Sequence, residues 1–176
     1  TDRLGFGKTI DDFYSQGGSV LEPINQILDG KNIFILGAGG VTSSIISTLE
    51  QKGGNLIISN RTKSKAEELK ILFPKIKTLD WGKKPESYNI VINTTSVGLN
   101  KGDKIQIDFN DCGKDKLFYD LIYNPKETNF LKEAKKFGAE VENGKMMFLY
   151  QAQKAFFIWH NVLPEVDNET INLLNL

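Results

Sequence analysis

The stretch Asn32-Ile33-Phe34-Ile35-Leu36-Gly37-Ala38-Gly39-Gly40-Val41 joins a run of apolar residues to a glycine-rich turn. Its first half, 32–36, is typical of a buried strand in a parallel sheet. Gly37 permits backbone angles that a side chain would forbid, and Gly39 lets the main chain approach a pyrophosphate closely. The next segment, 41–52, has apolar residues at helical spacing, so free amides at a helix N-terminus would face the phosphates. The stretch therefore predicts a dinucleotide site.

A second element favours this interpretation over a tight turn that binds nothing, an alternative left open because Thr42 stands where the dinucleotide fingerprint has Gly or Ala. Ser59-Asn60-Arg61-Thr62 ends the next predicted strand, where a side chain usually reads the adenine ribose. Sites selective for NAD(H) place Asp or Glu there, whereas the Arg61 guanidinium would bind a ribose 2′-phosphate through two parallel hydrogen bonds. We therefore expect NADP(H) as the cofactor.

The other interpretation of Arg61 and Lys65 is a solvated helix start. Cations at a helix N-terminus oppose the macrodipole, so this cluster is mildly unfavourable unless an anion binds it.

Composition argues against several other classes of protein. Lys and Arg together number 22, as do Asp and Glu, so net charge gives no reason to expect nucleic acid or an anionic membrane as a partner. The single cysteine, Cys112, excludes an internal disulfide framework and favours a reducing cytoplasm. No apolar run is long enough to span a membrane, and no signal peptide is recognised. The only histidine, His160, is expected to pack or lie at the surface, and no metal site is expected.

Strand and helix patterns alternate along most of the chain. The predicted strands are 32–36, 55–59, 76–79, 89–93, 117–120 and 138–141. The predicted helices are 4–16, 19–30, 41–52, 63–72, 127–137, 145–162 and about 168–175. This alternation predicts an α/β fold, a Rossmann-like, doubly wound, mainly parallel six-stranded sheet with flanking helices. The helix over 145–162 leaves little polar face, so it needs cover on nearly all sides.

Six segments, in order, carry a family resemblance. They are Thr1–Phe6, Gly37–Gly40, Asn60–Lys65, Asn93–Leu99, Asp120–Thr128 and Asn143–Ala152. Each makes physical sense by itself: Asn93-Thr94-Thr95-Ser96, for example, follows an apolar strand at the sheet edge where ligands bind, and Thr128 is a plausible helix cap. Together they resemble the shikimate dehydrogenase family, in its cofactor-binding domain and the helices flanking it.

The resemblance implies the reversible reduction of 3-dehydroshikimate to shikimate with NADPH. It makes Asp2 the carboxylate of a catalytic Lys–Asp pair at the substrate hydroxyl, and Asp2, Tyr123 and Gln151 the substrate contacts. Without the family, Asp2 would be read as an ordinary helix N-cap. The residues that the resemblance assigns to the cofactor are Gly37, Ala38, Gly39, Gly40, Val41, Asn60, Arg61, Thr62, Lys65, Thr94, Thr95, Ser96, Leu121 and Gly144.

The chain departs from the family in one respect. The family's N-terminal substrate domain, which carries the catalytic Lys, is expected to be absent, because the chain starts inside the first motif and none of its lysines matches. We expect a linking helix over 1–18, an NADP-binding domain over 19–144, and C-terminal helices over 145–176 that return toward the substrate domain. The chain would then bind NADP(H) and catalyse little. Its apolar helices would be partly uncovered, which favours self-association or a homodimer.

Three alternatives remain. A quinate/shikimate dehydrogenase using NAD would favour an acidic residue in place of Arg61. A catalytically silent NADP-binding module would have no evident use for Asp2, Tyr123 and Gln151. The related domain of glutamyl-tRNA reductase shares the glycine turn, but gives no reason for the segment from Asn143 to Gln151.

Overall fold

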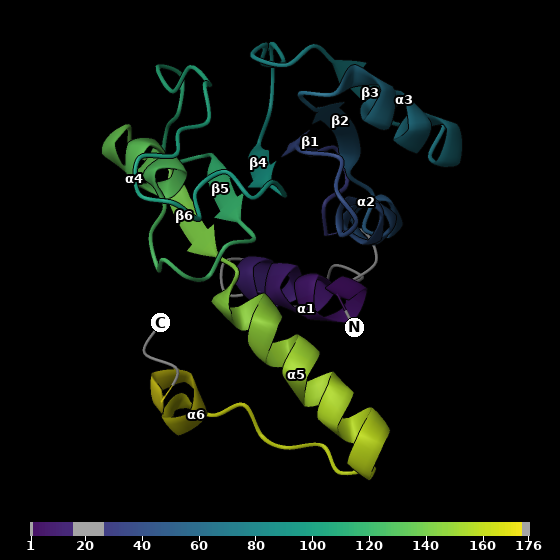
Figure 1. The fold of residues 1–176 in the computed structure, drawn as a ribbon, viewed down its shortest axis with the longest axis vertical. Coiled ribbons are helices and arrows are strands. Elements are labelled where there is room, and N and C mark those ends of the chain that lie inside the picture. The colour runs from purple at the N-terminus through teal and green to yellow at the C-terminus, as the bar shows by residue number, and fades with distance from the viewer. Residues whose placement is uncertain (1, 16–26, 174–176) are drawn as a thin grey trace.

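The computed structural model describes residues 2–15 and 27–173 of the 176-residue chain. Its six strands form one parallel sheet, flanked by helices (Figure 1). The strands are β1 (Asn32–Leu36), β2 (Asn55–Ser59), β3 (Lys77–Leu79), β4 (Ile90–Asn93), β5 (Leu117–Asp120) and β6 (Glu140–Asn143). The helices are α1 (Asp2–Ser15), α2 (Thr42–Gln51), α3 (Lys63–Leu72), α4 (Asn129–Lys136), α5 (Lys145–His160) and α6 (Asn168–Leu173).

All strands of the sheet run in the same direction, but the order in which the chain adds them reverses at β1. The spatial order is β3-β2-β1-β4-β5-β6, so the chain first moves outward from β1 and then continues on the other side of it. Leu36 at the end of β1 is level with Ser59 of β2 and Asn93 of β4. Ligands of open parallel sheets bind at the carboxyl ends of the strands, next to such a reversal. The doubly wound, Rossmann-like fold is therefore confirmed, and the glycine turn lies at its switch point.

Each face of the sheet has its own apolar layer, because successive side chains of a strand point to opposite faces. Ile33 and Ile35 of β1 pack in one layer with residues of α1, α2 and α3. Phe34 of β1 packs in the other layer with residues of α4. The segment 97–112, which contains no regular helix, also contributes to that second layer; its Phe109 ring contacts both Phe118 and Phe130.

Most predicted elements agree with the observed ones to within two residues. The last strand was placed too early, over 138–141. Gly138 has a φ of 91°, and the amide of Ala139 still bonds to the carbonyl of Ala134 at the end of α4, so extended pairing starts only at Glu140. Of the helix predicted over 19–30, residues 19–26 lie outside the described part of the chain, and residues 27–30 form a turn.

The C-terminal part of α5 extends away from the sheet, toward the loop that leads to α6 (Figure 1). Phe156, Ile158 and Trp159 are exposed there, and α6 buries none of its described residues. This confirms the expected uncovered apolar surface. No helix in residues 2–15 and 27–173 is long and apolar enough to cross a membrane.

Candidate functional site

The turn after β1 requires glycine at its first position. Gly37 has a φ of 114°, and a Cβ there would lie 2.6 Å from Oγ1 of Thr94. Its amide donates to the carbonyl of Ser59 at 2.8 Å, which ties the turn to the end of β2. Gly39 and Gly40 are exposed, and a Cβ on either would meet nothing within 4 Å. The turn therefore leaves open space before α2, whose first turn carries no acidic residue, and this arrangement suits a pyrophosphate.

Asn60 holds the second predicted element against the turn. Its Oδ1 accepts a hydrogen bond from the amide of Ala38 at 3.1 Å, and its Nδ2 donates to the carbonyl of Thr62 at 2.8 Å. Arg61, between them, is exposed and lines a cavity of about 350 Å³. Thr62 is the N-cap residue of α3, although its side chain makes no capping bond. The two Asn60 hydrogen bonds hold the backbone on either side of Arg61 next to the glycine turn. Binding of a ribose 2′-phosphate by Arg61 stays a prediction.

The charges around Arg61 favour it as the anion-binding cation. Lys63 pairs with Asp80 at 2.8 Å, so its charge is partly neutralised. Lys65, in the first turn of α3, is exposed. Arg61 and Lys65 make no ion pair with the described residues. Their side chains are therefore available to a phosphate.

The loop after β4 divides its hydroxyl groups between internal and open positions. Thr94 is buried; its Oγ1 donates to the carbonyl of Leu36 at 2.9 Å and therefore accepts from Oγ1 of Thr42, also at 2.9 Å. Thr95 bonds through Oγ1 to Oδ1 of Asn93 at 2.7 Å. Ser96 is exposed. Contacts of all three with a cofactor stay predictions, and Ser96 is the most open of the hydroxyls.

Leu121 and Gly144, which the resemblance assigns to the cofactor, are in contact with each other. A Cβ at Gly144 would lie 2.0 Å from the carbonyl oxygen of Leu121, so only glycine fits between β6 and α5. The amide of Gly144 also donates to the carbonyl of Ile122 at 3.3 Å. Leu121 and Gly144 therefore lie together at the carboxyl edge of the sheet.

Of the three predicted substrate residues, Gln151 is on α5, and Asp2 and Tyr123 each contact that helix. Nε2 of Gln151 donates to Oδ1 of Asp2 at 3.1 Å, although 149 positions separate them. The ring of Tyr123 stacks on that of Phe148, with 4.7 Å between centroids and 24° between planes. Because residues three apart share a helix face, Phe148 and Gln151 bring Tyr123 and Asp2 to neighbouring positions. Gly5 lets α1 approach, since its Cβ would lie 2.6 Å from the carbonyl oxygen of Met147.

Comparison with known proteins identifies the family of the chain. The family model described as Shikimate / quinate 5-dehydrogenase matches residues 20–121. The NADP(+) shikimate dehydrogenase of Pelagibacter ubique is 55% identical over 157 residues, which cover 89% of this chain. The chain belongs to the shikimate/quinate 5-dehydrogenase family. It spans 59% of the Pelagibacter protein and 60% of the NADP(+) shikimate dehydrogenase of Caldicellulosiruptor bescii, which is 37% identical over 99% of this chain.

Solved structures of shikimate/quinate 5-dehydrogenases share the fold. Shikimate dehydrogenase from Aquifex aeolicus matches with a TM-score of 0.79 and 33% identity, over 93% of this chain and 57% of that one. The Thermus thermophilus enzyme, solved with NADP(H) and shikimate, matches with a TM-score of 0.73 and 28% identity, over 93% and 57%.

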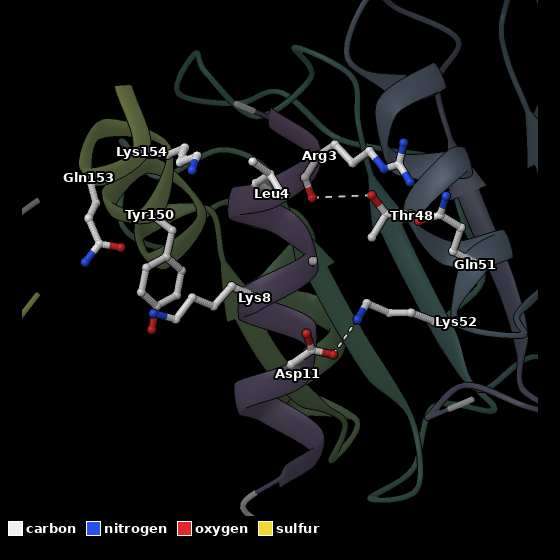
Figure 2. Close-up of a pocket in the computed structure, with 11 residues that line it drawn as sticks. Arg3, Leu4, Lys8, Asp11, Thr48, Gln51, Lys52, Tyr150, Gln153 and Lys154 are labelled. Atoms are coloured by element: carbon white, nitrogen blue, oxygen red, sulfur yellow. Dashed lines mark hydrogen bonds and ion pairs between the residues drawn. The ribbon is translucent and has the colours of Figure 1, made fainter. Parts of the chain in front are cut away.

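One cavity of this family member is lined by residues of α1, α2 and α5, including Arg3 and Tyr150, the chain neighbours of Asp2 and Gln151. It has a volume of about 730 Å³ and lies beside α1, where it contains none of the predicted residues (Figure 2). Two of its lysines have partners within the protein: Lys52 pairs with Asp11, and Nζ of Lys8 lies 4.2 Å from the centre of the Tyr150 ring.

Proposed function

We propose that this chain is the NADP(H)-binding part of an enzyme that interconverts 3-dehydroshikimate and shikimate. The observation that carries the proposal is the Asn60 bridge, because it fixes Arg61 beside the glycine turn that faces open space. The names of the Pelagibacter and Caldicellulosiruptor relatives, and the ligands in the Thermus structure, support the same cofactor and substrate.

In this proposal the glycine turn and the start of α2 bind the pyrophosphate, and Arg61 with Lys65 binds the ribose 2′-phosphate. Leu121, Gly144 and the loop 94–96 border the nicotinamide. When bound, NADPH supplies a hydride to the carbonyl carbon of the substrate. The residues of this chain orient the two reactants and exclude water from between them.

The substrate side is assigned to Asp2, Gln151 and Tyr123. The Asp2 carboxylate accepts a hydrogen bond from the reacting hydroxyl, and Gln151 holds that carboxylate in place. A primary amide offers both a donor and acceptors, which suits a polyol. Tyr123, supported by Phe148, offers a further hydroxyl.

The cofactor assignment is tested by titrating the chain with NADPH and with NADH. We expect Arg61→Ala to weaken NADPH binding by about 5- to 150-fold, because a charged hydrogen-bonding partner contributes about 1–3 kcal/mol. NADH affinity should be unchanged. Lys70→Ala, which removes an exposed cation from the last turn of α3, the helix that follows Arg61, is the matched control. Equal affinities for the two cofactors, unaffected by Arg61→Ala, would rule out NADP(H); tighter binding of NADH would favour the NAD-dependent quinate/shikimate alternative.

We further infer the substrate, location and assembly of the protein. The complete protein should reduce NADP⁺ with shikimate, and an Asp2→Asn variant should lose most of this activity; no turnover of shikimate would contradict the substrate.

The single buried thiol of Cys112 suits the cytoplasm. Residues 1–18, 19–144 and 145–176 are proposed as linking helix, cofactor domain and C-terminal helices. The exposed apolar side chains of α5 are proposed to join two copies of the chain.

A further inference from the structure

A buried carboxylate lies at the point where the loops of the proposed site converge. Asp120 ends β5 with none of its surface exposed. Its Oδ1 accepts from Nδ2 of Asn93 at 3.0 Å and from the amide of Ile122 at 3.1 Å. Its Oδ2 accepts from Oγ1 of Thr128 at 2.6 Å. One side chain thus binds the end of β4, the start of the following loop and the cap of α4.

Asn93 carries these connections into the neighbouring loop. Its Nδ2 also donates to the carbonyl of Val97 at 3.1 Å. Its Oδ1 accepts from both the amide and the hydroxyl of Thr95, at 3.0 and 2.7 Å. Gly98 closes the loop with a φ of 127°, and its Cβ would lie 3.1 Å from Cγ2 of Thr128. The loop 94–98 and the segment 121–128 are therefore packed and bonded as one unit.

Holding a carboxylate in this position is costly. Burial raises the pKa of Asp120 to about 6, although the hydrogen bonds from Thr128, Ile122 and Asn93 act in the opposite direction. A buried ionisable group is a weak source of stability compared with apolar packing, and its best-attested use is to specify one arrangement. A carboxylate accepts from all three donors at once. An Asn side chain could keep its oxygen toward Nδ2 of Asn93 and the amide of Ile122, but it would reverse the hydrogen bond with the Thr128 hydroxyl and remove the negative charge from all three contacts.

We propose that Asp120 is a positioning residue, which holds the loop 94–98 and the segment 121–128 in one arrangement so that the nicotinamide half of the cofactor and Tyr123 meet. The inference rests on the proposed function, since it takes residues 94–96 and Tyr123 as ligand contacts. It assigns no contact between Asp120 and either ligand. Asp120 acts through Asn93, Ile122 and Thr128.

Two probes separate this role from a general loss of structure. NADPH should contact Arg61, the glycine turn and the loops that Asp120 holds, whereas adenosine 2′,5′-bisphosphate, which lacks the nicotinamide half, should contact only Arg61 and the glycine turn. We expect Asp120→Asn to weaken NADPH binding by about tenfold or more, the scale of one lost charged hydrogen bond, and to leave the bisphosphate affinity within about twofold. Lys84→Met removes the ion pair with Asp111 at the amino ends of β4 and β5, away from the proposed site. This variant is the control for reduced stability and should change neither affinity.

A second pair of variants keeps the test decisive if Asp120→Asn folds poorly. Thr128→Val removes the donor to Oδ2, and Thr128→Ser restores a hydroxyl at the same place. Selective loss of NADPH affinity in the Val variant and its recovery in the Ser variant would support the inference. Unchanged NADPH affinity in both Asp120→Asn and Thr128→Val, or equal losses for both probes, would overturn it. Failure of the unmodified chain to bind either probe would instead overturn the proposed function, and the inference with it.

Discussion

At the scale of single residues, the site depends on glycines that lack a side chain for two different reasons. Gly144 sits against the backbone of Leu121, where a Cβ has no room, while Gly39 faces open space. The first glycine is required by packing in the protein itself. The second has no such requirement in the structure, so we attribute it to the close approach of a ligand.

This contrast gives a paired prediction. We expect Gly144→Ala to destabilise the fold by about 1–3 kcal/mol or more, because the backbone at Leu121 has to move. We expect Gly39→Ala to leave the urea midpoint nearly unchanged and to weaken NADPH binding by about tenfold or more, because a methyl group would then stand between main chain and pyrophosphate. Unfolding curves and NADPH titrations of both variants measure this. A Gly39→Ala variant that binds NADPH normally would argue against the pyrophosphate assignment.

The sequence predicted some residue roles and missed others for physical reasons. A role for Arg61 could be proposed from the sequence because an exposed guanidinium is suited to binding phosphate, and that role stays a prediction. The contact between Asp2 and Gln151 could not be derived from any local period, since it joins distant helices. The sequence places Asp120 in a family motif but does not predict its burial, because a charged residue at the end of a strand is usually exposed. Thr42 looked like a departure from the fingerprint, yet its hydroxyl bonds to that of Thr94.

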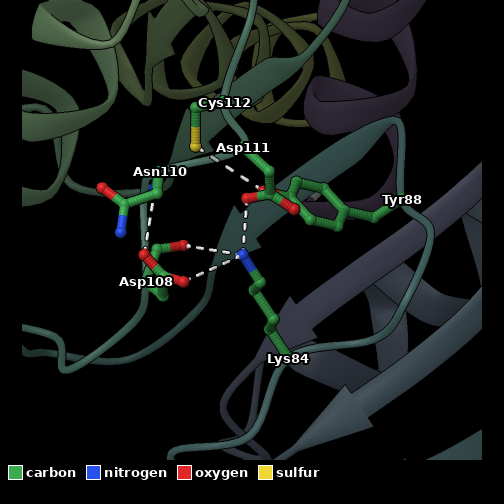
Figure 3. A network of polar contacts seen from close by, with 6 residues as sticks. All are labelled: Lys84, Tyr88, Asp108, Asn110, Asp111 and Cys112. Carbon is green, nitrogen blue, oxygen red and sulfur yellow. Dashed lines mark hydrogen bonds and ion pairs between the residues drawn. The ribbon is translucent and has the colours of Figure 1, made fainter.

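At the scale of elements, hydrophobic periodicity predicted the inner strands β1, β2, β4 and β5 to within one residue, because buried parallel strands are short apolar runs. The edge strand β6 has no buried residue, and its predicted position is two residues too early. The structure of loops without hydrophobic periodicity could not be predicted in this way. Chief among them are the two loops joined at the amino edge of β4 and β5 (Figure 3). Nζ of Lys84 lies 2.6 Å from Oδ1 of Asp111, and the hydroxyl of Tyr88 donates to the same oxygen at 2.7 Å. We call these three residues the amino-edge cluster.

The amino-edge cluster predicts an acid-sensitive part of the stability. Burial alone would raise the pKa of Asp111, but the hydrogen bonds from Lys84 and Tyr88 outweigh it and lower the pKa below its ordinary value. The unfolded chain therefore takes up this proton first, so the contribution is complete above about pH 4 and is lost as pH falls through the lower folded-state pKa.

We expect Asp111→Asn to lower the free energy of unfolding by about 1 kcal/mol at neutral pH and to reduce its decline below about pH 4. Urea unfolding at a series of pH values measures both effects. Glu86→Gln, which changes an exposed carboxylate in the loop of Lys84 and Tyr88, is the control. An Asp111→Asn variant with the same acid dependence as the unmodified chain would show that the cluster contributes nothing to it.

At the scale of the whole molecule, the sheet is enclosed and the C-terminal helices are not. The alternation of strands and helices predicted a parallel, doubly wound sheet, and the structure supplies the order of its strands. The sequence could not predict what covers α5, because the apolar residues of this helix indicate only that cover is needed. Ile158 and Trp159 remain 62% and 76% exposed, and the chain has no net charge to keep copies apart.

We therefore expect the chain to self-associate as its concentration rises, with sedimentation velocity as the measurement. Ile158→Gln combined with Trp159→Gln should shift the chain toward monomer without lowering its melting temperature, because neither side chain is buried. Leu72→Gln, which changes an equally exposed residue on α3, should leave the association as it is. A monomer at every concentration would contradict this prediction.

The two contacts on α5 have a consequence for how the chain tolerates change in length. Phe148 supports Tyr123 and Gln151 supports Asp2, from positions less than one turn apart. One inserted residue between them would rotate everything beyond it by about 100° about the helix axis. The Asp2 contact would then point away while the Tyr123 contact stayed in place. We expect α5 to accept an insertion after His160 far more readily than one between Phe148 and Gln151.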